Sequence, residues 1–202
     1  PDKDNIYFKE EGGNLKDTLY FLLKNLEEMN TLWIRISLNA SDLIKNTKEK
    51  EREDLKPLIS ETITRLSLLE GLTIEIYENE VLPKLMEIIF MYNDCLSQEY
   101  IMECIIRAFP DTYNLKCMEF ILLNLSKLAE GVNVKKLFII LLEKLQIYVE
   151  GIMTQNSNDN NEENNKLLLD IYNVYPILMK NYDIILNNEF KNVSKVLIDI
   201  LE

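Results

Sequence analysis

The segment EYIMECIIRAFPD, Glu99 to Asp111, decides the fold of this chain. Its apolar side chains recur at the three-to-four spacing of one helical face: Tyr100, Ile101, Ile105 and Ile106. Pro110 ends the helix, because its ring disfavours the helical conformation of Phe109. Asp111 then stands where it can cap the next helix. The segment therefore predicts a helix, a tight break and a second helix.

The composition favours helices along the whole chain. Only five glycines and five prolines interrupt 202 residues that are rich in Leu, Ile, Lys and Glu. No alternating apolar–polar run is flanked by turn residues, so we expect no strand. We expect about eight helices: Leu15–Leu38, Lys48–Leu69, Ile74–Tyr92, Asn93–Phe109, Thr112–Ala129, one beginning at Val134, Lys166–Leu186 and Val193–Leu201.

Three prolines fall inside these expected helices, and one of them, Pro176, is a possible kink in Lys166–Leu186. Pro57 leaves two alternatives: either the packed helix begins there, with Pro57 in its first turn, or the helix kinks. Pro83 lies too deep for a first turn and removes a hydrogen bond to the carbonyl of Asn79, so we expect a kink there.

An internal repeat indicates how the helices are arranged. The pattern Glu-Gly-x-polar-aliphatic occurs at Glu70–Ile74 and again at Glu130–Val134, sixty residues on. In each copy the glycine supplies a left-handed stop and the polar residue, Thr73 or Asn133, caps the next helix. The helices that follow both carry Leu-x-Lys-Leu. A helix of about 20 residues and a pair of about 40 lie in the range of HEAT and armadillo arrays. The chain is therefore predicted to be an all-α, HEAT/armadillo-like α-solenoid of antiparallel helix pairs.

We expect residues 1–202 to form a single α-solenoid segment. Residues 1–13 are a polar, loose lead-in, and because the chain starts at Pro1 we expect it to belong to a longer protein. Residues 152–165 form an Asn-rich loop whose tract Gln155–Asn165 has no apolar side chain to bury, which predicts disorder.

Two apolar features bear on contacts. Trp33 is either a partner anchor or a core residue, and its place in a helical stripe favours the core. The helix from Val134 is apolar nearly all round, because Ile139, Ile140 and Ile147 widen its stripe. Such a helix is expected to be covered on more than one side.

Charge and residue types exclude several function classes. A net charge of −12 argues against binding of nucleic acid or of an anionic membrane, since both need clustered Lys and Arg. No apolar run approaches the length of about 20 residues that spans a bilayer. The chain has no histidine, which removes Ser-His-Asp and Cys-His systems, and it has no glycine-rich nucleotide-binding motif.

The remaining chemical groups favour structural roles. The cysteines, Cys95, Cys104 and Cys117, show no metal-binding spacing, and Cys104 lies on an apolar helical face where it serves as a core filler. The acidic pairs are expected to be solvated: Glu27-Glu28, Glu53-Asp54 and Glu162-Glu163. We therefore predict no catalytic, cofactor-binding or metal-binding residue and no cofactor, and the sequence assigns no partner-binding residue.

Several stretches resemble one family, the large scaffold subunit of retromer. The helix followed by Phe-Pro-Asp at Glu99–Asp111 is almost identical to a segment of that family. The other stretches are EMNTLWIR (Glu28–Arg35), KEKERED (Lys48–Asp54), RLSLLEG (Arg65–Gly71) and EGVNVK (Glu130–Lys135). The resemblance runs from about Phe21 to about Tyr148 and implies the same α-solenoid fold.

The resemblance also implies a function. In the family an arrestin-fold subunit binds near the start of the large subunit, on a Pro-Arg-Leu-Tyr-Leu-Arg segment, and a phosphoesterase-fold subunit binds near its end. The chain is thus expected to be a non-enzymatic scaffold segment of a cytoplasmic complex that is peripheral on endosomal membranes. That complex would act in endosome-to-Golgi retrograde transport of transmembrane cargo. Cargo tails and sorting nexins are further possible partners, the membrane is reached only through partners, and no nucleic acid is involved.

A second hypothesis comes from the fold alone. A HEAT-repeat transport receptor or regulatory adaptor would bind a peptide in a concave groove. Rows of Asn or Trp repeated along successive helices would favour that reading, but this chain has a single Trp and no such row.

Replacement of Gln155–Asn165 by a short Gly-Ser linker should leave the melting temperature within a few degrees of that of the parent chain. Ordering a backbone residue costs about 1–2 kcal/mol, and this tract has no apolar surface to offset it. Thermal unfolding followed by circular dichroism measures the difference. A large loss of stability would show that the tract packs against the rest of the chain.

Overall fold

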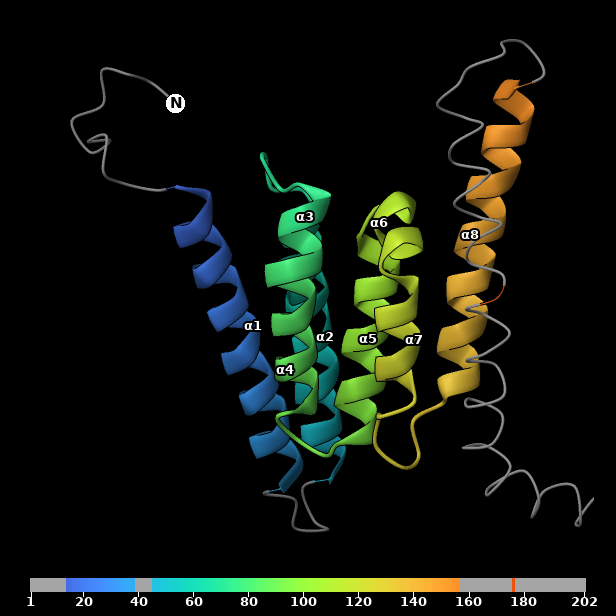
Figure 1. Ribbon diagram of the computed structural model, residues 1–202. Helices are drawn as coiled ribbons and strands as arrows, with labels where there is room; N and C mark the ends of the chain where they lie inside the picture. The colour runs from blue at the N-terminus through green and yellow to red at the C-terminus, as the bar shows by residue number, and fades with distance from the viewer. Residues whose placement is uncertain (1–13, 39–44, 157–175, 177–202) are drawn as a thin grey trace, which may run out of the picture. The chain divides into compact units, whose positions relative to one another are not determined.

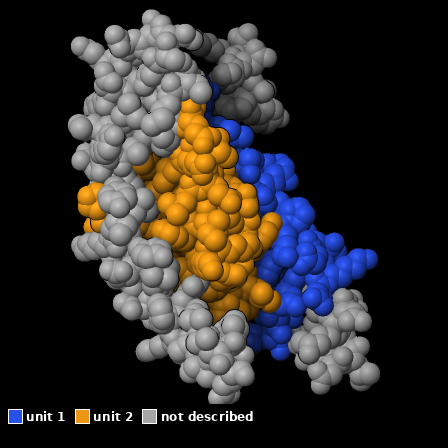
Figure 2. Space-filling model, turned by 90° about the vertical axis from the view of Figure 1, so that its right-hand side faces the viewer, with its two compact units in different colours: residues 1–92 blue, residues 93–202 orange. Residues whose placement is uncertain are grey.

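The computed structural model describes residues 14–38, 45–156 and 176, and every regular element within them is helical (Figure 1). The elements are α1 (Leu15–Leu38), α2 (Lys45–Ser67), α3 (Ile74–Ile76), the π-helical turn η2 (Tyr77–Val81), α4 (Leu82–Phe90), α5 (Cys95–Ala108), α6 (Asp111–Lys116), α7 (Met118–Leu125) and α8 (Val134–Asn156). They belong to two compact units, residues 1–92 and 93–202, which Figure 2 distinguishes by colour.

Unit 1 is built from three antiparallel helical segments. α1 and the α3–η2–α4 segment run in the same direction and α2 runs back, and α1 contacts both α2 and α4 (Figure 1). The apolar faces predicted from the sequence form the core, with the following side chains almost wholly buried: Leu26, Trp33, Ile59, Ile63, Leu66, Leu85 and Ile88. Trp33 is only 2% exposed, so the core interpretation of this residue is confirmed.

Proline is accommodated differently in the two helices of unit 1. α2 begins at Lys45, so Pro57 lies inside the helix, and the alternative that placed it in the first turn is wrong. At Pro83 the interruption takes the form of a π-helical turn. The Leu82 N–H donates to the carbonyl of Tyr77, five residues back, and Pro83 falls in the first turn of α4. The wider π-helical turn shifts the hydrogen bonding by one residue, so the helical path accommodates the missing N–H of Pro83.

The repeated turns have the same geometry in both copies. Gly71 and Gly131 adopt positive φ angles of 85° and 98°, the left-handed region that glycine enters without strain. The Thr73 hydroxyl accepts a hydrogen bond from the Ile76 N–H at 3.4 Å, and Asn133 Oδ1 accepts one from the Lys136 N–H at 2.9 Å. The left-handed glycines and the caps are therefore confirmed at both sites, but the glycines do not end the preceding helices, because α2 ends at Ser67 and α7 at Leu125.

Unit 2 contains α5, α6, α7 and α8, and α8 contacts both α5 and α6. Its core is apolar and includes Ile101, Met102, Ile105, Phe109, Leu122, Leu125, Leu137 and Leu141. Cys104 and Cys117 are buried, which confirms the core role expected of Cys104. The expected helix Thr112–Ala129 is divided at Cys117, which has φ −93° and ψ 12°, and it ends at Leu125, before Gly131. No helix-breaking residue marks that division in the sequence.

The prediction that Asp111 caps α6 is wrong. Pro110 occupies the N-cap position and Asp111 lies in the first turn. The reason is that Phe109 is extended, with φ −78° and ψ 150°, so the helix begins directly after the proline. The carboxylate of Asp111 instead lies 3.0 Å from Nζ of Lys144 on α8.

α8 departs from expectation in two respects. Ile140 is buried, but Ile139 and Ile147 are 42% and 68% exposed, so the covered surface does not extend round the helix. The helix also continues to Asn156 and so includes residues 152–156, which were expected to begin the loop. The rest of that loop, the lead-in 1–13 and the helices expected at Lys166–Leu186 and Val193–Leu201 lie outside the described residues.

Replacement of Asn30 by Ala should lower the free energy of unfolding by about 1–3 kcal/mol, the usual cost of leaving a buried polar group without its partner. The Asn30 side chain is 1% exposed, and its Nδ2 donates to the carbonyl of Ile88 at 2.8 Å, which joins α1 to α4. Urea denaturation measures the change. Asn25→Ala, at an exposed position of the same helix, is the matched control. Equal effects of the two changes would contradict the assigned role of Asn30.

Candidate functional site

The acidic pairs considered as general acid–base candidates lie on the surface. Glu27 and Glu28 both pair with Lys24, at 2.8 and 3.4 Å, and Glu53 pairs with Lys56 at 2.6 Å. The side chain of Glu53 is 59% exposed and that of Glu28 is 63% exposed. These carboxylates are solvated, as expected, whereas Glu162-Glu163 lies outside the described residues.

Metal-binding and membrane-spanning features were searched for in the same part of the chain. No group of three or more His, Cys, Asp or Glu side chains that could hold a metal ion occurs among the residues with a described position. None of the described helices is long and apolar enough to cross a bilayer.

Lys144 makes several polar contacts within the described part of unit 2. Its Nζ donates to the backbone carbonyls of Ile106, Arg107 and Phe109 at 2.9–3.0 Å and lies 3.0 Å from a carboxylate oxygen of Asp111. The last carbonyls of a helix have no partner within the helix and carry partial negative charge. The ammonium group on α8 therefore caps the C-terminus of α5 and neutralises Asp111 at the same point.

A second side chain caps the same end of α5. Asn114 on α6 is 1% exposed, and its Nδ2 donates to the carbonyls of Ile106 at 2.9 Å and Phe109 at 3.5 Å. The Phe-Pro-Asp turn is thus held from both α6 and α8. We call this set of contacts, from Lys144 and Asn114 to the C-terminal carbonyls of α5, the α5 cap.

The opposite end of α5 holds the loop that precedes α8. Gln98 Oε1 accepts from the Ala129 N–H at 2.7 Å, and Glu99 Oε2 accepts from the Asn133 N–H at 3.0 Å. Lys136 pairs with Glu99 at 3.0 Å and Glu103 at 2.8 Å.

These contacts shift the pKa values of the paired groups. Burial acts to raise the pKa of Glu103, but hydrogen bonds and charge from Lys136 and Arg107 outweigh it and lower that pKa. The hydrogen bonds that Lys136 donates to Glu103 and Glu99 raise the pKa of Lys136. Both groups therefore remain charged at neutral pH, and α5 is tied to α8 at both of its ends.

The α5 cap has a structural role, because its contacts join α5 to α6 and α8. Its lysine is engaged by three carbonyls and a carboxylate that all belong to the same helix junction. Sequence reasoning recognised Leu-x-Lys-Leu at Leu142–Leu145 only as part of a repeat. In the other copy Lys84 is exposed and pairs with Glu87, so the two lysines have different roles. The signal that could have indicated the cap is the combination of a helix that stops at Phe-Pro and a lysine on a later helix.

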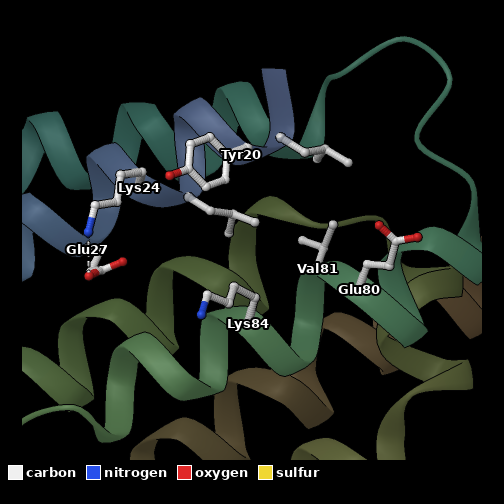
Figure 3. Close-up of a pocket in the computed structure, with 8 residues that line it drawn as sticks. Tyr20, Lys24, Glu27, Glu80, Val81 and Lys84 are labelled. Atoms are coloured by element: carbon white, nitrogen blue, oxygen red, sulfur yellow. Dashed lines mark hydrogen bonds and ion pairs between the residues drawn. The ribbon is translucent and has the colours of Figure 1, made fainter. Parts of the chain in front are cut away.

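Unit 1 contains a groove between α1 and α4, with a volume of about 250 Å³ (Figure 3). We call it the α1–α4 groove. Its lining residues are Leu19, Tyr20, Leu23, Lys24 and Glu27 of α1, Glu80 and Val81 of η2, and Lys84 of α4. The sequence analysis did not predict it, because it depends on how far apart two helices pack.

The fold and these sites define a class of protein: an all-α protein of the α-solenoid type, whose polar contacts fix helices to one another. A model of the family "Vacuolar protein sorting-associated protein 35" matches residues 1–201. The chain is similar to Vacuolar protein sorting-associated protein 35B of Arabidopsis thaliana, with 34% identity over 70% of this chain and 18% of that protein. It is also similar to the protein 35 of Dictyostelium discoideum, with 34% identity over 67% of this chain and 17% of that protein. The chain is likewise similar to the protein 35 of Schizosaccharomyces pombe, with 35% identity over 74% of this chain and 18% of that protein.

The chain belongs to this vacuolar protein sorting 35 family, the large subunit of retromer, as the resemblance indicated. It spans less than a fifth of the length of these curated relatives. The family match and the helical fold agree with each other.

Replacement of Lys144 by Met should lower the free energy of unfolding by about 1.5–3 kcal/mol, the range for hydrogen bonds to a charged group. Methionine keeps most of the apolar stem but removes both the donor to the α5 carbonyls and the positive charge beside Asp111. Urea denaturation of the two proteins compares their stabilities. Lys127→Met, at an exposed position of the same unit, is the matched control. A Lys144→Met protein as stable as that control would show that the cap contributes nothing.

Proposed function

We propose that this chain is a scaffold segment of the retromer cargo-recognition complex, acting in endosome-to-Golgi retrograde transport of transmembrane cargo. Membership of the vacuolar protein sorting 35 family is the observation that carries the proposal. Its localisation would be cytoplasmic and peripheral on the endosomal membrane, and its role would be non-enzymatic.

The physical basis of a scaffold role is the density of fixed contacts between helices. A spacer transmits geometry only when each helix is held against its neighbours, because packed elements deform less than loosely joined ones. In unit 1 the buried Asn30–Ile88 hydrogen bond joins α1 to α4. In unit 2 the α5 cap and the Lys136 ion pairs join α5 to α8. These contacts support a role in which the segment sets the distance between binding modules elsewhere in the complex.

The partners of the complex would bind through other parts of the parent protein. The chain has no Pro-Arg-Leu-Tyr-Leu-Arg segment, and the family resemblance places the contact with the phosphoesterase-fold subunit nearer the C-terminus of the large subunit. Cargo tails and sorting nexins remain proposed partners.

The isolated chain should therefore bind neither the arrestin-fold subunit nor the phosphoesterase-fold subunit, whereas the full-length parent should bind both. A specific interface buries about 1,200–2,000 Å², and the segments expected to supply it are elsewhere. Calorimetry with each purified subunit from the same source measures binding. The full-length parent is the positive control. Micromolar or tighter binding of the isolated chain would show that this segment is itself a docking surface. If the parent bound neither subunit, the proposed function would be wrong.

A further inference from the structure

The outer face of α7 carries two large apolar side chains that the core of unit 2 does not cover. Phe120 is 39% exposed and Leu123 is 42% exposed. The apolar residues of α7 that are buried lie on the other side of the helix: Met118, Ile121, Leu122 and Leu125. The core side of α7 is thus supplied by other residues, and Phe120 and Leu123 present apolar surface to the outside.

A lysine lies one helical turn beyond each of these two side chains. Lys116 comes four residues before Phe120, and Lys127 comes four residues after Leu123. Residues three and four apart are neighbours on a helix surface, so the four side chains follow one another along a single face. We call Lys116, Phe120, Leu123 and Lys127 the α7 stripe. Its apolar middle and basic ends distinguish it from apolar side chains that are exposed singly.

Backbone hydrogen bonds keep the stripe in line across the junction between α6 and α7. The Cys117 N–H donates to the Tyr113 carbonyl at 3.0 Å, and the Ile121 N–H donates to the Cys117 carbonyl at 2.9 Å. Both bonds span four residues, so the path stays helical through the junction. After α7 the Lys127 N–H donates to the Asn124 carbonyl at 3.0 Å, which keeps Lys127 about one turn beyond Leu123.

The two lysines of the stripe have no acidic partner within the chain. Elsewhere in unit 2 the ammonium groups of Lys136 and Lys144 pair with carboxylates of α5 and α6. Lys116 and Lys127 are exposed and form no ion pair with any residue that the structure describes. With Glu119 of α7 included, the face still carries a net positive charge, although the chain as a whole has a net charge of −12. The stripe therefore favours an acidic ligand.

From this arrangement we propose that the α7 stripe binds an acidic, amphipathic helical segment of a partner protein. Two apolar side chains of that segment cover Phe120 and Leu123, and a carboxylate beyond each of them pairs with Lys116 or Lys127. Burial of apolar surface drives the association, and the ion pairs set its register and select acidic partners. A helix fits because its own three- and four-residue spacing matches that of the stripe. The proposal does not rest on the proposed function, since it follows from the described surface of unit 2.

The test measures fluorescence polarisation of a labelled, alanine-rich helical peptide added to the 202-residue chain. The peptide carries glutamate, leucine, leucine and glutamate at the spacing of the α7 stripe. One control peptide replaces the leucines by serine, and the other replaces the glutamates by glutamine. We expect the serine peptide to bind about tenfold more weakly and the glutamine peptide about fivefold more weakly. No binding of the first peptide, or equal binding of all three, would overturn the proposal.

Charge variants locate the binding site. Lys116→Glu with Lys127→Glu should weaken binding of the glutamate peptide by about tenfold and remove its advantage over the glutamine peptide. The matched control is Lys16→Glu with Lys50→Glu, which makes the same change in net charge at exposed positions of unit 1. That control should keep the preference for the glutamate peptide. Equal weakening by both double variants would show only general repulsion from a more acidic protein and would overturn the proposal.

A further variant tests the apolar middle of the stripe. Phe120→Ser with Leu123→Ser should weaken binding of the leucine peptide by about tenfold and leave the weak binding of the serine peptide unchanged. Leu58→Ser with Leu68→Ser, at exposed positions of unit 1, is the matched control. Thermal unfolding checks that both proteins are folded, and the charge variants decide if one of them is not. Unchanged binding of the leucine peptide would overturn the proposal.

An anionic membrane is a less suitable occupant of the stripe, because attachment to acidic lipid depends on larger clusters of Lys and Arg. Co-sedimentation with phosphatidylserine vesicles tests this alternative. We expect the chain to remain in the supernatant. Binding to the vesicles that is lost in the Lys116→Glu, Lys127→Glu variant, without binding of the leucine peptide, would assign the stripe to a lipid surface and overturn the proposal.

Discussion

The packing of unit 2 depends on how the C-terminus of α5 is closed. Pro110 forces Phe109 into an extended conformation and ends the helix beside α6 and α8, which contact its last carbonyls. If these carbonyls had no partners, the free energy of unfolding would be lower by the contribution of several hydrogen bonds. Lys144 from α8 and Asn114 from α6 supply the donors. A break in one helix therefore dictates which side chains two others must present, and this constraint fixes the register of α8 against α5.

The same principle operates with different chemistry in unit 1. There the interruption at Pro83 is absorbed within the helical path by a π-helical turn, and no lysine is needed. The buried amide of Asn30 instead reaches the carbonyl of Ile88 on α4. Lys84 occupies the position of Lys144 in the internal repeat. It pairs with Glu87 and lies at the rim of a groove. Two copies of one sequence pattern thus give a locked contact in one unit and an open surface in the other.

These two outcomes suit a protein that works through its shape. In unit 2 the charged contacts at both ends of α5 lie between helices, where they oppose relative movement. In unit 1 a groove of about 250 Å³ lies between α1 and α4. A scaffold needs both rigid spacing and surfaces that other molecules can contact, and the family to which the chain belongs is consistent with such a role.

The sequence by itself determined the helical class, the bounds of α1, the two left-handed glycines and the caps that follow them, and the burial of Trp33 and Cys104. These features follow from local rules, because helical periodicity, glycine at positive φ and side-chain caps act within a few residues. Tertiary structure alone decided the π-helical turn before Pro83, the division at Cys117, the pairing of Asp111 with Lys144 and the α1–α4 groove. Each of these depends on the distance and orientation between segments far apart in the sequence, and no local pattern encodes that separation.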